Sequence, residues 1–282
     1  MSLENVLTNW SHYRRGHEDG GHHKYEHMWS MVVDLNKCIG CTACSVACYA
    51  ENNLPTVGKE FFAKGQGMHW LRIERYWDEP DLKQDASMEF QEMGGSFLPM
   101  MCQHCNAATC EPVCPVAATY HTPDGLNAQV YNRCIGSRYC SNNCPYRLRY
   151  FNFYSYYERA WPEPMHLQLN PDISVRDKGV MEKCTFCMQR IRTVKDTARA
   201  ENRKVRDGEV APACVQGCPT SAMTFGDLLD ADSKVSKLWK EHEVQIGKTA
   251  QHKHNKDLRG YRVLEGLNTD PKVLYLERVR EA

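Results

Sequence analysis

The residues most able to do chemistry in this chain are its cysteines. The sequence of 282 residues holds 15 of them, in four tightly spaced groups. An odd number cannot close completely into disulfides, and disulfide-dense domains are usually much shorter. Regular spacing also disfavours isolated buried thiols, so the pattern indicates metal ligation. The groups are Cys38-x2-Cys41-x2-Cys44-x3-Cys48, Cys102-x2-Cys105-x4-Cys110-x3-Cys114, Cys134-x2-Ser137-x2-Cys140-x3-Cys144, and Cys184-x2-Cys187 with Cys214-x3-Cys218.

The first group has the spacing of a bacterial two-cluster ferredoxin. Cys38, Cys41 and Cys44 would wrap one corner of a cubane and reach different irons, while Cys48 would point to the other cluster of a pair. A structural zinc site normally uses two pairs of ligands. A third cysteine at this spacing therefore favours iron–sulfur clusters, and a colourless zinc module is the alternative.

Counting the ligand positions leaves no cysteine over. Four positions in each of four groups make 16 places, and Ser137 fills one of them, which accounts for all 15 cysteines. None remains for a catalytic thiol or a disulfide. A serine hydroxyl has a far higher pKa than a thiol and is a poor iron ligand, so the third group predicts a three-iron cluster. A serine-ligated four-iron cluster is the alternative.

An internal repeat relates the first and third groups. Residues 36–40 match residues 132–136 at an offset of 96, and Cys41, Cys44 and Cys48 align with Ser137, Cys140 and Cys144. Two copies of one ligand loop imply a duplicated module. The elements that would position these loops are strands at 31–35, 71–74, 128–131 and 273–276, a helix within 183–201, and a helix capped by Asp232 or Ser233.

Composition excludes several classes of protein. Lys plus Arg equals Asp plus Glu at 35 each, whereas a nucleic-acid-binding protein would show a basic excess. Mean hydropathy is −0.61, and no run of 18 apolar residues predicts a membrane span. Dinucleotide and phosphate-binding loops are also missing from the sequence. We therefore expect no catalytic residues and no binding of nucleic acid.

The first residues of the chain could suggest export. Arg14-Arg15 is not followed by an apolar core, so we do not interpret it as a signal peptide. The chain would stay in the cytoplasm or be exported with a partner that carries the signal. A solvated arm is the preferred interpretation of the histidines here, and a metal-binding tract is the alternative; they are His12, His17, His22, His23 and His27.

An aromatic stretch follows the third cysteine group. Residues 146–161 carry eight aromatic side chains, with Arg147, Arg149 and Arg159 between them. Aromatic residues and arginine are enriched at protein interfaces. We interpret the stretch as a partner-docking surface, part of it buried against the clusters, and plain core packing is the alternative.

The four-group pattern resembles the iron–sulfur subunits of the complex iron–sulfur molybdoenzyme family. Residues 131–153, from Tyr131-Asn-Arg-Cys134 to Tyr150-Phe-Asn-Phe153, look closest to the subunits of alternative complex III and the menaquinone reductase complex. Residues 261–276 are similar to the same family's C-terminal segment. The resemblance spans about residues 30–278. The module is not fused to a large domain in this sequence, which favours the menaquinone reductase type.

The resemblance implies a crossed set of ligands. Each of the four clusters would take cysteines from two groups, giving three [4Fe-4S] clusters and one [3Fe-4S] cluster with Ser137 at its vacant corner. The [4Fe-4S] sets would be Cys38, Cys41, Cys44 with Cys218; Cys48 with Cys184, Cys187, Cys214; and Cys102, Cys105, Cys110 with Cys144. The [3Fe-4S] set would be Cys114, Cys134 and Cys140.

The resemblance also implies a fold and a function. The fold would be α+β, with duplicated bacterial two-cluster ferredoxin-like modules stabilised by their clusters. Module one would take residues 31–101 with 180–235 and module two residues 102–179, each with an insertion. An N-terminal arm at 1–30 and a partner-contacting C-terminal tail at 236–282 would complete the chain.

The expected function is that of a non-catalytic electron-transfer subunit in a membrane-associated respiratory oxidoreductase. Its partners would be a large molybdopterin-enzyme-like subunit and an integral membrane quinone-binding subunit, with a cytochrome c subunit as a further candidate. It would lie peripherally on the membrane, with the periplasmic side favoured and the cytoplasmic side open. The alternatives are a molybdenum reductase for sulfur or nitrogen compounds, and a soluble polyferredoxin.

Overall fold

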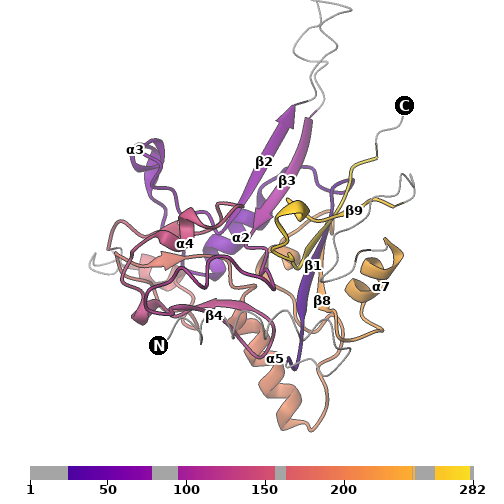
Figure 1. Ribbon diagram of the computed structural model, residues 1–282. Helices are drawn as coiled ribbons and strands as arrows, with labels where there is room; N and C mark the ends of the chain where they lie inside the picture. The colour runs from indigo at the N-terminus through magenta and orange to yellow at the C-terminus, as the bar shows by residue number, and fades with distance from the viewer. Residues whose placement is uncertain (1–24, 78–94, 156–162, 243, 245–257, 280–282) are drawn as a thin grey trace, which may run out of the picture.

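The computed structural model describes residues 25–77, 95–155, 163–242, 244 and 258–279. Short helices and strands alternate along the chain (Figure 1). Their bounds are β1 (Trp29–Asp34), α2 (Ala43–Glu51), α3 (Gly58–Ala63), β2 (Leu71–Trp77), β3 (Gly95–Met101), β4 (Thr119–His121), β5 (Asn127–Gln129), η2 (Tyr131–Arg133), α4 (Tyr139–Asn142), β6 (Tyr150–Phe151), η3 (Met165–Gln168), β7 (Met181–Glu182), α5 (Met188–Ala200), α6 (Ala213–Gln216), β8 (Met223–Asp227), α7 (Lys234–Glu241), β9 (Gly260–Tyr261), η4 (Glu265–Leu267) and β10 (Val273–Leu276).

A four-stranded sheet in the order β8-β1-β10-β9 carries the core. Strand β1 pairs antiparallel with β8 and parallel with β10. Both β1 and β10 are buried along almost their whole length, as near-continuous apolar runs in the middle of a sheet usually are. Alternate side chains of β1 therefore face two different apolar clusters.

One face of this sheet is covered by α7. Val235 and Trp239 of the helix pack against Val32 of β1 and Leu274 of β10. The side chain of Ser233 caps the helix by accepting a hydrogen bond from the Ser236 N–H at 3.1 Å. The predicted helix and its cap are confirmed.

The opposite face packs on the larger core, which includes cysteines. Met31 and Val33 of β1 lie in one apolar cluster with Cys44 and Cys48 of α2 and with Cys214 of α6. Helices α2 and α6 pack against each other. The main sheet thus lies directly behind the first and fourth cysteine groups.

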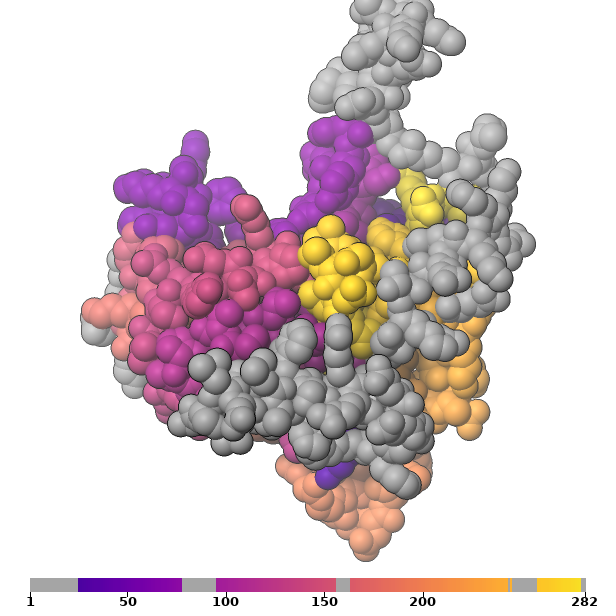
Figure 2. All heavy atoms as spheres, viewed as in Figure 1, coloured from indigo at the N-terminus to yellow at the C-terminus, as the bar shows by residue number. Residues whose placement is uncertain are grey.

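Two features project from the body. Strands β2 and β3 pair antiparallel from Leu71 with Met101 to Trp77 with Gly95, and this hairpin rises away from the sheet (Figure 1). Helix α3 projects on the same side, while α5 lies at the opposite end (Figure 2). The base of the hairpin is buried at Leu71 and Met101, whereas its tip at Trp77 is exposed.

The middle of the chain contains little regular structure. It has two small antiparallel pairs, β4 with β5 and β6 with β7. The second cysteine group lies between β3 and β4, and the third lies between β5 and β6. The mixture of short helices and mainly antiparallel strands agrees with the α+β prediction at this coarse level. The boundaries of two modules stay a prediction.

The predicted strands at 31–35, 71–74 and 273–276 are confirmed as β1, β2 and β10. The strand expected at 128–131 is shorter, because β5 ends at Gln129 and a 3-10 turn begins at Tyr131. The helix expected within 183–201 begins only at Met188. Phe186 and Cys187 have positive φ values of 54° and 53°, a left-handed conformation that a helix interior does not allow.

The two ends of the chain contribute more to the body than expected. Strand β10 lies between β1 and β9, so part of the predicted tail at 236–282 is an interior strand. At the other end, β1 already begins at Trp29, inside the predicted arm, and His27 Nδ1 lies 2.7 Å from Asp227 Oδ2. The other four arm histidines, His12, His17, His22 and His23, lie outside the described residues.

Within the described residues, no helix has the length and apolar character needed to cross a membrane.

Candidate metal centres

The repeated cysteine loops have the same backbone conformation. Gly40 and Gly136 have φ values of 69° and 72°, and Thr42 and Arg138 have φ values of 62° and 61°. Thr42 and Arg138 are the left-handed N-caps of α2 and α4. Both glycines are required, because a Cβ at Gly40 would lie 2.4 Å from the Phe97 ring and one at Gly136 would lie 2.3 Å from the Gly179 carbonyl. The sequence repeat is therefore a structural repeat as well.

Each Cys-Pro sequence makes a turn that points a backbone amide at the thiol. In two of them the N–H four residues after the cysteine donates to its Sγ, from Ala118 to Cys114 at 3.2 Å and from Ala222 to Cys218 at 3.3 Å. The preceding residues Ala117 and Ser221 have positive φ values of 48° and 51°, which turn the amide back.

The third Cys-Pro turn follows the same pattern. The Leu148 N–H lowers the pKa of Cys144 against the larger, opposing effect of burial, and Arg147 before it has a φ of 51°. Hydrogen bonds of this kind stabilise a thiolate, which is the form that binds iron.

The first predicted set gathers cysteines from both ends of the chain. Burial raises the pKa of Cys44 to about 11, and nearby Cys218, Cys38 and Cys41 add to the rise. The pKa of Cys218 is instead below its usual value, because hydrogen bonds from Thr220, Ala222 and Met223 outweigh its burial. The Cys44 thiol therefore interacts electrostatically with thiols of its own group and with Cys218, which lies 180 positions after Cys38 in the sequence.

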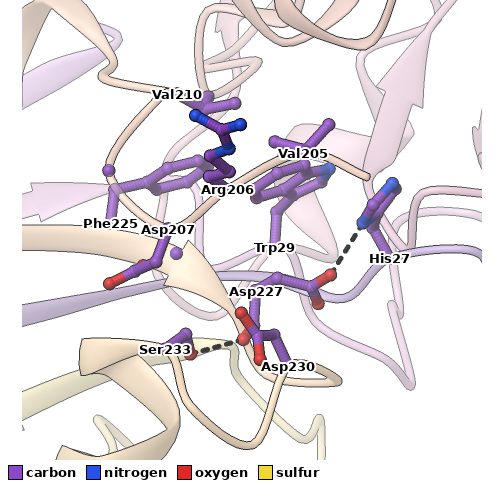
Figure 3. Close-up of a pocket in the computed structure, with 12 residues that line it drawn as sticks. His27, Trp29, Val205, Arg206, Asp207, Val210, Phe225, Asp227, Asp230 and Ser233 are labelled. Carbon is purple, nitrogen blue, oxygen red and sulfur yellow. Dashed lines mark hydrogen bonds and ion pairs between the residues drawn. The ribbon is translucent and has the colours of Figure 1, made fainter. Parts of the chain in front are cut away.

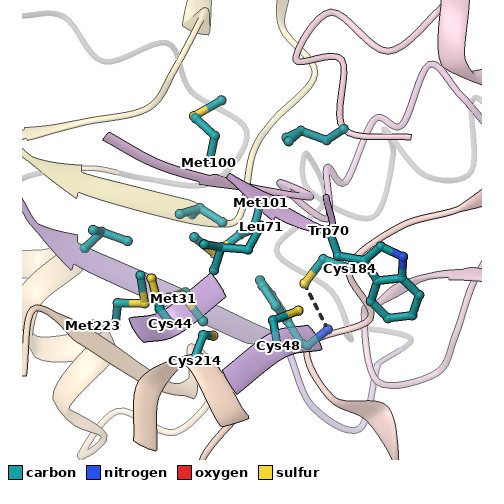
Figure 4. Close-up of a cluster of buried hydrophobic side chains, with 14 of the residues drawn as sticks. Met31, Cys44, Cys48, Trp70, Leu71, Met100, Met101, Cys184, Cys214 and Met223 are labelled. Carbon is teal, nitrogen blue, oxygen red and sulfur yellow. Dashed lines mark hydrogen bonds between the residues drawn. The ribbon is translucent and has the colours of Figure 1, made fainter. Parts of the chain in front are cut away.

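The second predicted set is the most deeply buried. Burial raises the pKa of Cys48 well above the usual value, and Cys184, Cys187 and Cys214 contribute further. Figure 4 shows the side chains of Cys48 and Cys184 pointing into the same part of the core. The Phe186 N–H donates to Cys184 Sγ at 3.5 Å, and the Ala213 N–H donates to Cys187 Sγ at 3.4 Å.

The third predicted set lines a cavity. Cys102, Cys105, Cys110 and Cys144 all face a partly enclosed space with about 340 Å³ of empty volume. Burial raises the pKa of Cys110 to about 12 and that of Cys105 well above its usual value. Cysteines from two groups thus line one partly enclosed space.

For the fourth predicted set, the structure records the surroundings of each thiol. Cys114 accepts from the Ala118 N–H, and Cys134 accepts from the Met181 N–H at 3.4 Å. Cys140 is buried in α4, and Ser137 is exposed, as Cys41 is in the first loop. The serine therefore occupies the backbone position that a ligand cysteine occupies in the other copy.

Sequence reasoning missed three buried cations beside these sites. Lys183 and Lys272 are fully buried, and Arg149 is 4% exposed. Lys183 Nζ donates to the carbonyl of Cys184 at 2.9 Å and to that of Asn127, and Lys272 Nζ donates to the Gly125 carbonyl. Burial lowers the pKa of Lys272 to about 8. In the sequence, only Arg149 could have been expected near a cluster site, because it follows Cys144-Pro145 closely.

The first residues of the aromatic stretch pack within this chain. Tyr146 is buried, and its hydroxyl lies 2.5 Å from Thr269 Oγ1, while the Tyr150 hydroxyl accepts from Arg72 at 3.0 Å. These contacts are with the rest of this chain. Residues 156–162 lie outside the described part, so the docking role of the stretch stays a prediction.

A pocket without cysteines lies beside β1 and β8, lined by His27, Trp29, Asp207 and Asp227 among others (Figure 3). Burial opposes ionisation of Asp227, but hydrogen bonds from His27 and from the N–H groups of Met28 and Leu229 hold its pKa below the usual value. Asp227 thereby fastens the start of β1 to β8.

Single-ion sites were also considered. Among the described residues, no group of three or more His, Cys, Asp or Glu side chains could hold one metal ion. The thiolates of a cubane bind different irons, so this finding concerns single-ion sites and not clusters.

Family models match the parts of the chain that carry the first three cysteine groups. Residues 37–118 and residues 93–159 each match a model described as a 4Fe-4S dicluster domain.

Relatives match most of the chain. It is 41% identical to the menaquinone reductase iron-sulfur cluster-binding subunit of Nitratidesulfovibrio vulgaris, over 89% of each chain. It is 35% identical to the putative dimethyl sulfoxide reductase iron-sulfur subunit of Halobacterium salinarum, over 88% of this chain and 78% of the relative. It is 32% identical to the arsenate respiratory reductase iron-sulfur subunit of a Shewanella species, over 76% and 87%.

Proposed function

The chain belongs to the iron–sulfur subunits of molybdoenzyme-associated respiratory complexes, and from that membership we propose that it holds three [4Fe-4S] clusters and one [3Fe-4S] cluster. It is an electron-transfer subunit of a membrane-associated respiratory oxidoreductase. Such clusters, when bound, accept and release single electrons. The polypeptide holds them, excludes water from them and sets their potentials.

The observation that carries the ligand proposal is the cavity between the second and third cysteine groups. Cys102, Cys105 and Cys110 share it with Cys144, in the crossed arrangement that the family resemblance implies. A second crossed set is supported by electrostatics, because the thiols of Cys184, Cys187 and Cys214 each raise the pKa of Cys48.

In the same way, Cys38, Cys41 and Cys218 raise the pKa of Cys44, which supports the set formed by these four cysteines. The backbone match between the Gly40 and Gly136 loops supports Cys134 and Cys140 as ligands of the remaining set, with Ser137 at the vacant corner, and the family resemblance adds Cys114.

Electrostatic interactions between neighbouring sets support a linear order of the four centres. Cys44 raises the pKa of Cys214, which relates the first set to the second. Cys102 raises the pKa of Cys184, which relates the second set to the third. Arg149 interacts with both Cys110 and Cys140, which relates the third set to the fourth. We therefore propose one row, with the Cys38 set and the Cys134 set at its ends.

The partners and location follow from the same proposal. The Cys38 end would face a large molybdopterin-enzyme-like subunit, and the Ser137 end would face a membrane subunit that binds quinone. A cytochrome c subunit is a further candidate. Ile39 and Ile135, beside the cysteines at the two ends of the proposed row, are 59% and 66% exposed, and partner surfaces would cover them. The subunit would lie peripherally on the membrane, on the periplasmic side if a partner carries it there.

A second candidate is supported by the relatives. Several are named as subunits of reductases for dimethyl sulfoxide, arsenate, selenate or tetrathionate. In that case the large partner would carry a molybdopterin and reduce such a compound. The greater identity to the menaquinone reductase subunit favours the quinone-linked role. A molybdopterin in the co-purified large subunit would favour the second candidate.

The test is isolation of the intact complex. Iron and acid-labile sulfide should reach about fifteen and about sixteen atoms per molecule of this chain, as three four-iron clusters and one three-iron cluster require. Low-temperature EPR of the oxidised sample should show the three-iron signal. Zinc in place of iron, or a monomeric chain that keeps all its clusters without partners, would contradict the proposal.

A further inference from the structure

We propose that Arg149 is a cation shared by the third and fourth cluster sites and that it raises the reduction potentials of both. The inference rests on the proposed ligand sets. It concerns a residue outside those sets, and it assigns that residue a role in electron transfer.

The geometry places the guanidinium between two sets. Arg149 Nη1 lies 3.2 Å from Sγ of Cys110, a ligand proposed for the third site. The guanidinium also interacts electrostatically with the thiol of Cys140, a ligand proposed for the fourth site, and this interaction adds to the rise in the pKa of Arg149. The main chain is held as well, because Ser141 Oγ in α4 donates to the Arg149 carbonyl at 2.8 Å. The position of the charge is therefore fixed by both loops.

The remaining contacts of the guanidinium are neutral. Arg149 Nη2 donates to Thr119 Oγ1 at 2.8 Å and to Gln129 Oε1 at 2.5 Å, and Nη1 donates to Asn127 Oδ1 at 3.3 Å. Within the described residues, no carboxylate forms an ion pair with Arg149. The carboxylate of Glu111 is instead paired with His121 at 2.5 Å.

A charge buried without a partner of opposite sign is costly. Arg149 is 4% exposed, and an arginine does not lose its proton in a protein. The anions nearest to it are the two sets of thiolates, so the cluster sites themselves supply its countercharge. This explains why an arginine is tolerated at a position that solvent does not reach.

The direction of the effect follows from charge. Reduction adds one negative charge to a cluster, and a fixed nearby cation stabilises the reduced form more than the oxidised form. Burial keeps the interaction from being screened by water and salt. Because one cation serves two sites, its removal should lower both potentials together and leave the other two sites unchanged.

The experiment is an EPR-monitored redox titration of the intact complex carrying Arg149→Gln. We expect the one-electron reduction equilibrium constants of the third and fourth centres to fall at least about tenfold, or about 59 mV. Arg149→Lys should leave the potentials of both centres close to those of the unaltered complex, because the positive charge is kept. Arg192→Gln is the control, because Arg192 is an exposed arginine of α5 and the same charge is lost there. It should shift neither centre.

Gln129→Glu is a second, nearly isosteric variant that would neutralise Arg149 without removing it. It should lower the same two potentials. Unchanged potentials in Arg149→Gln, or a shift of only one centre, would overturn the inference. Loss of cluster signals from both Arg149→Gln and Gln129→Glu would also overturn it, since it would show a role in assembly instead. Absence of the three-iron signal from the unaltered complex would instead refute the proposed clusters.

Discussion

The serine at position 137 allows a sharp test of the cluster type. Ser137→Cys should convert the proposed three-iron cluster into a four-iron cluster, because it supplies the missing thiolate. The structure indicates that the new side chain would be placed as Cys41 is. The preceding glycines, Gly136 and Gly40, differ by 3° in φ (72° and 69°), and the following residues, Arg138 and Thr42, differ by 1° (61° and 62°).

The size of the effect follows from the stoichiometry. Iron should rise from about fifteen to about sixteen atoms per molecule, with sulfide unchanged at about sixteen. The EPR signal of the oxidised three-iron centre should fall toward zero, which is a much larger relative change. Ser137 is exposed, so the substitution should alter folding stability by no more than about 0.5 kcal/mol.

The assay is iron and sulfide analysis combined with EPR of the oxidised complex. Ser137→Ala is the control, because a residue at a vacant corner can lose its hydroxyl without losing iron. If Ser137→Ala lowers the iron content, serine is a ligand and the four-iron alternative is correct. An undiminished three-iron signal in Ser137→Cys would refute the reasoning from the repeated backbone.

Three further outcomes follow from the packing. Arg176→Met should destabilise the subunit by about 3–5 kcal/mol, measured as a lower temperature of cluster loss, because Arg176 and Glu182 form a buried pair at 3.0 Å. Ser233→Ala should weaken α7 by about 1 kcal/mol, seen as roughly fivefold faster amide exchange there. Removal of iron by a chelator should abolish cooperative unfolding in circular dichroism, because each ligand set joins distant segments.

Each of these outcomes has its own control. The double variant Arg176→Met with Glu182→Met should recover most of the lost stability, because no charge is then left buried without a partner. Asp232→Ala should leave α7 unchanged, since Ser233 is the residue that caps it. Retention of the full circular dichroism spectrum and a cooperative transition in the iron-free chain would contradict a fold stabilised by clusters.

Much of the site could be predicted from local spacing. Three cysteines spaced three residues apart suit one cluster corner whatever the rest of the fold is. The alignment of the two repeats puts Ser137 at the position of Cys41. The strands at 31–35 and 273–276 were predictable because they are short apolar runs, interrupted only by Asp34. By contrast, Phe186 and Cys187 take up left-handed conformations that shorten α5, and helix propensity could not show this.

The buried cations required tertiary structure. In the sequence, Arg149 is one of three arginines in an aromatic stretch, and Lys183 and Lys272 are ordinary lysines. Lys272 is buried beside the pairing of β10 with β1, and Arg149 is buried between α4 and the second cysteine group, where it contacts Ser141 and Cys110. Burial depends on which distant segments meet, and a residue's own neighbours in the chain do not encode it.

The same reasoning separates ligand type from ligand pairing. Residue identity and spacing predict that thiolates will bind iron, because that chemistry depends on a few consecutive residues. The meeting of Cys144 with Cys102, Cys105 and Cys110 around one cavity depends on long-range folding. Spacing within one group cannot indicate which other group lies across from it, so the arrangement in space had to come from the folded chain.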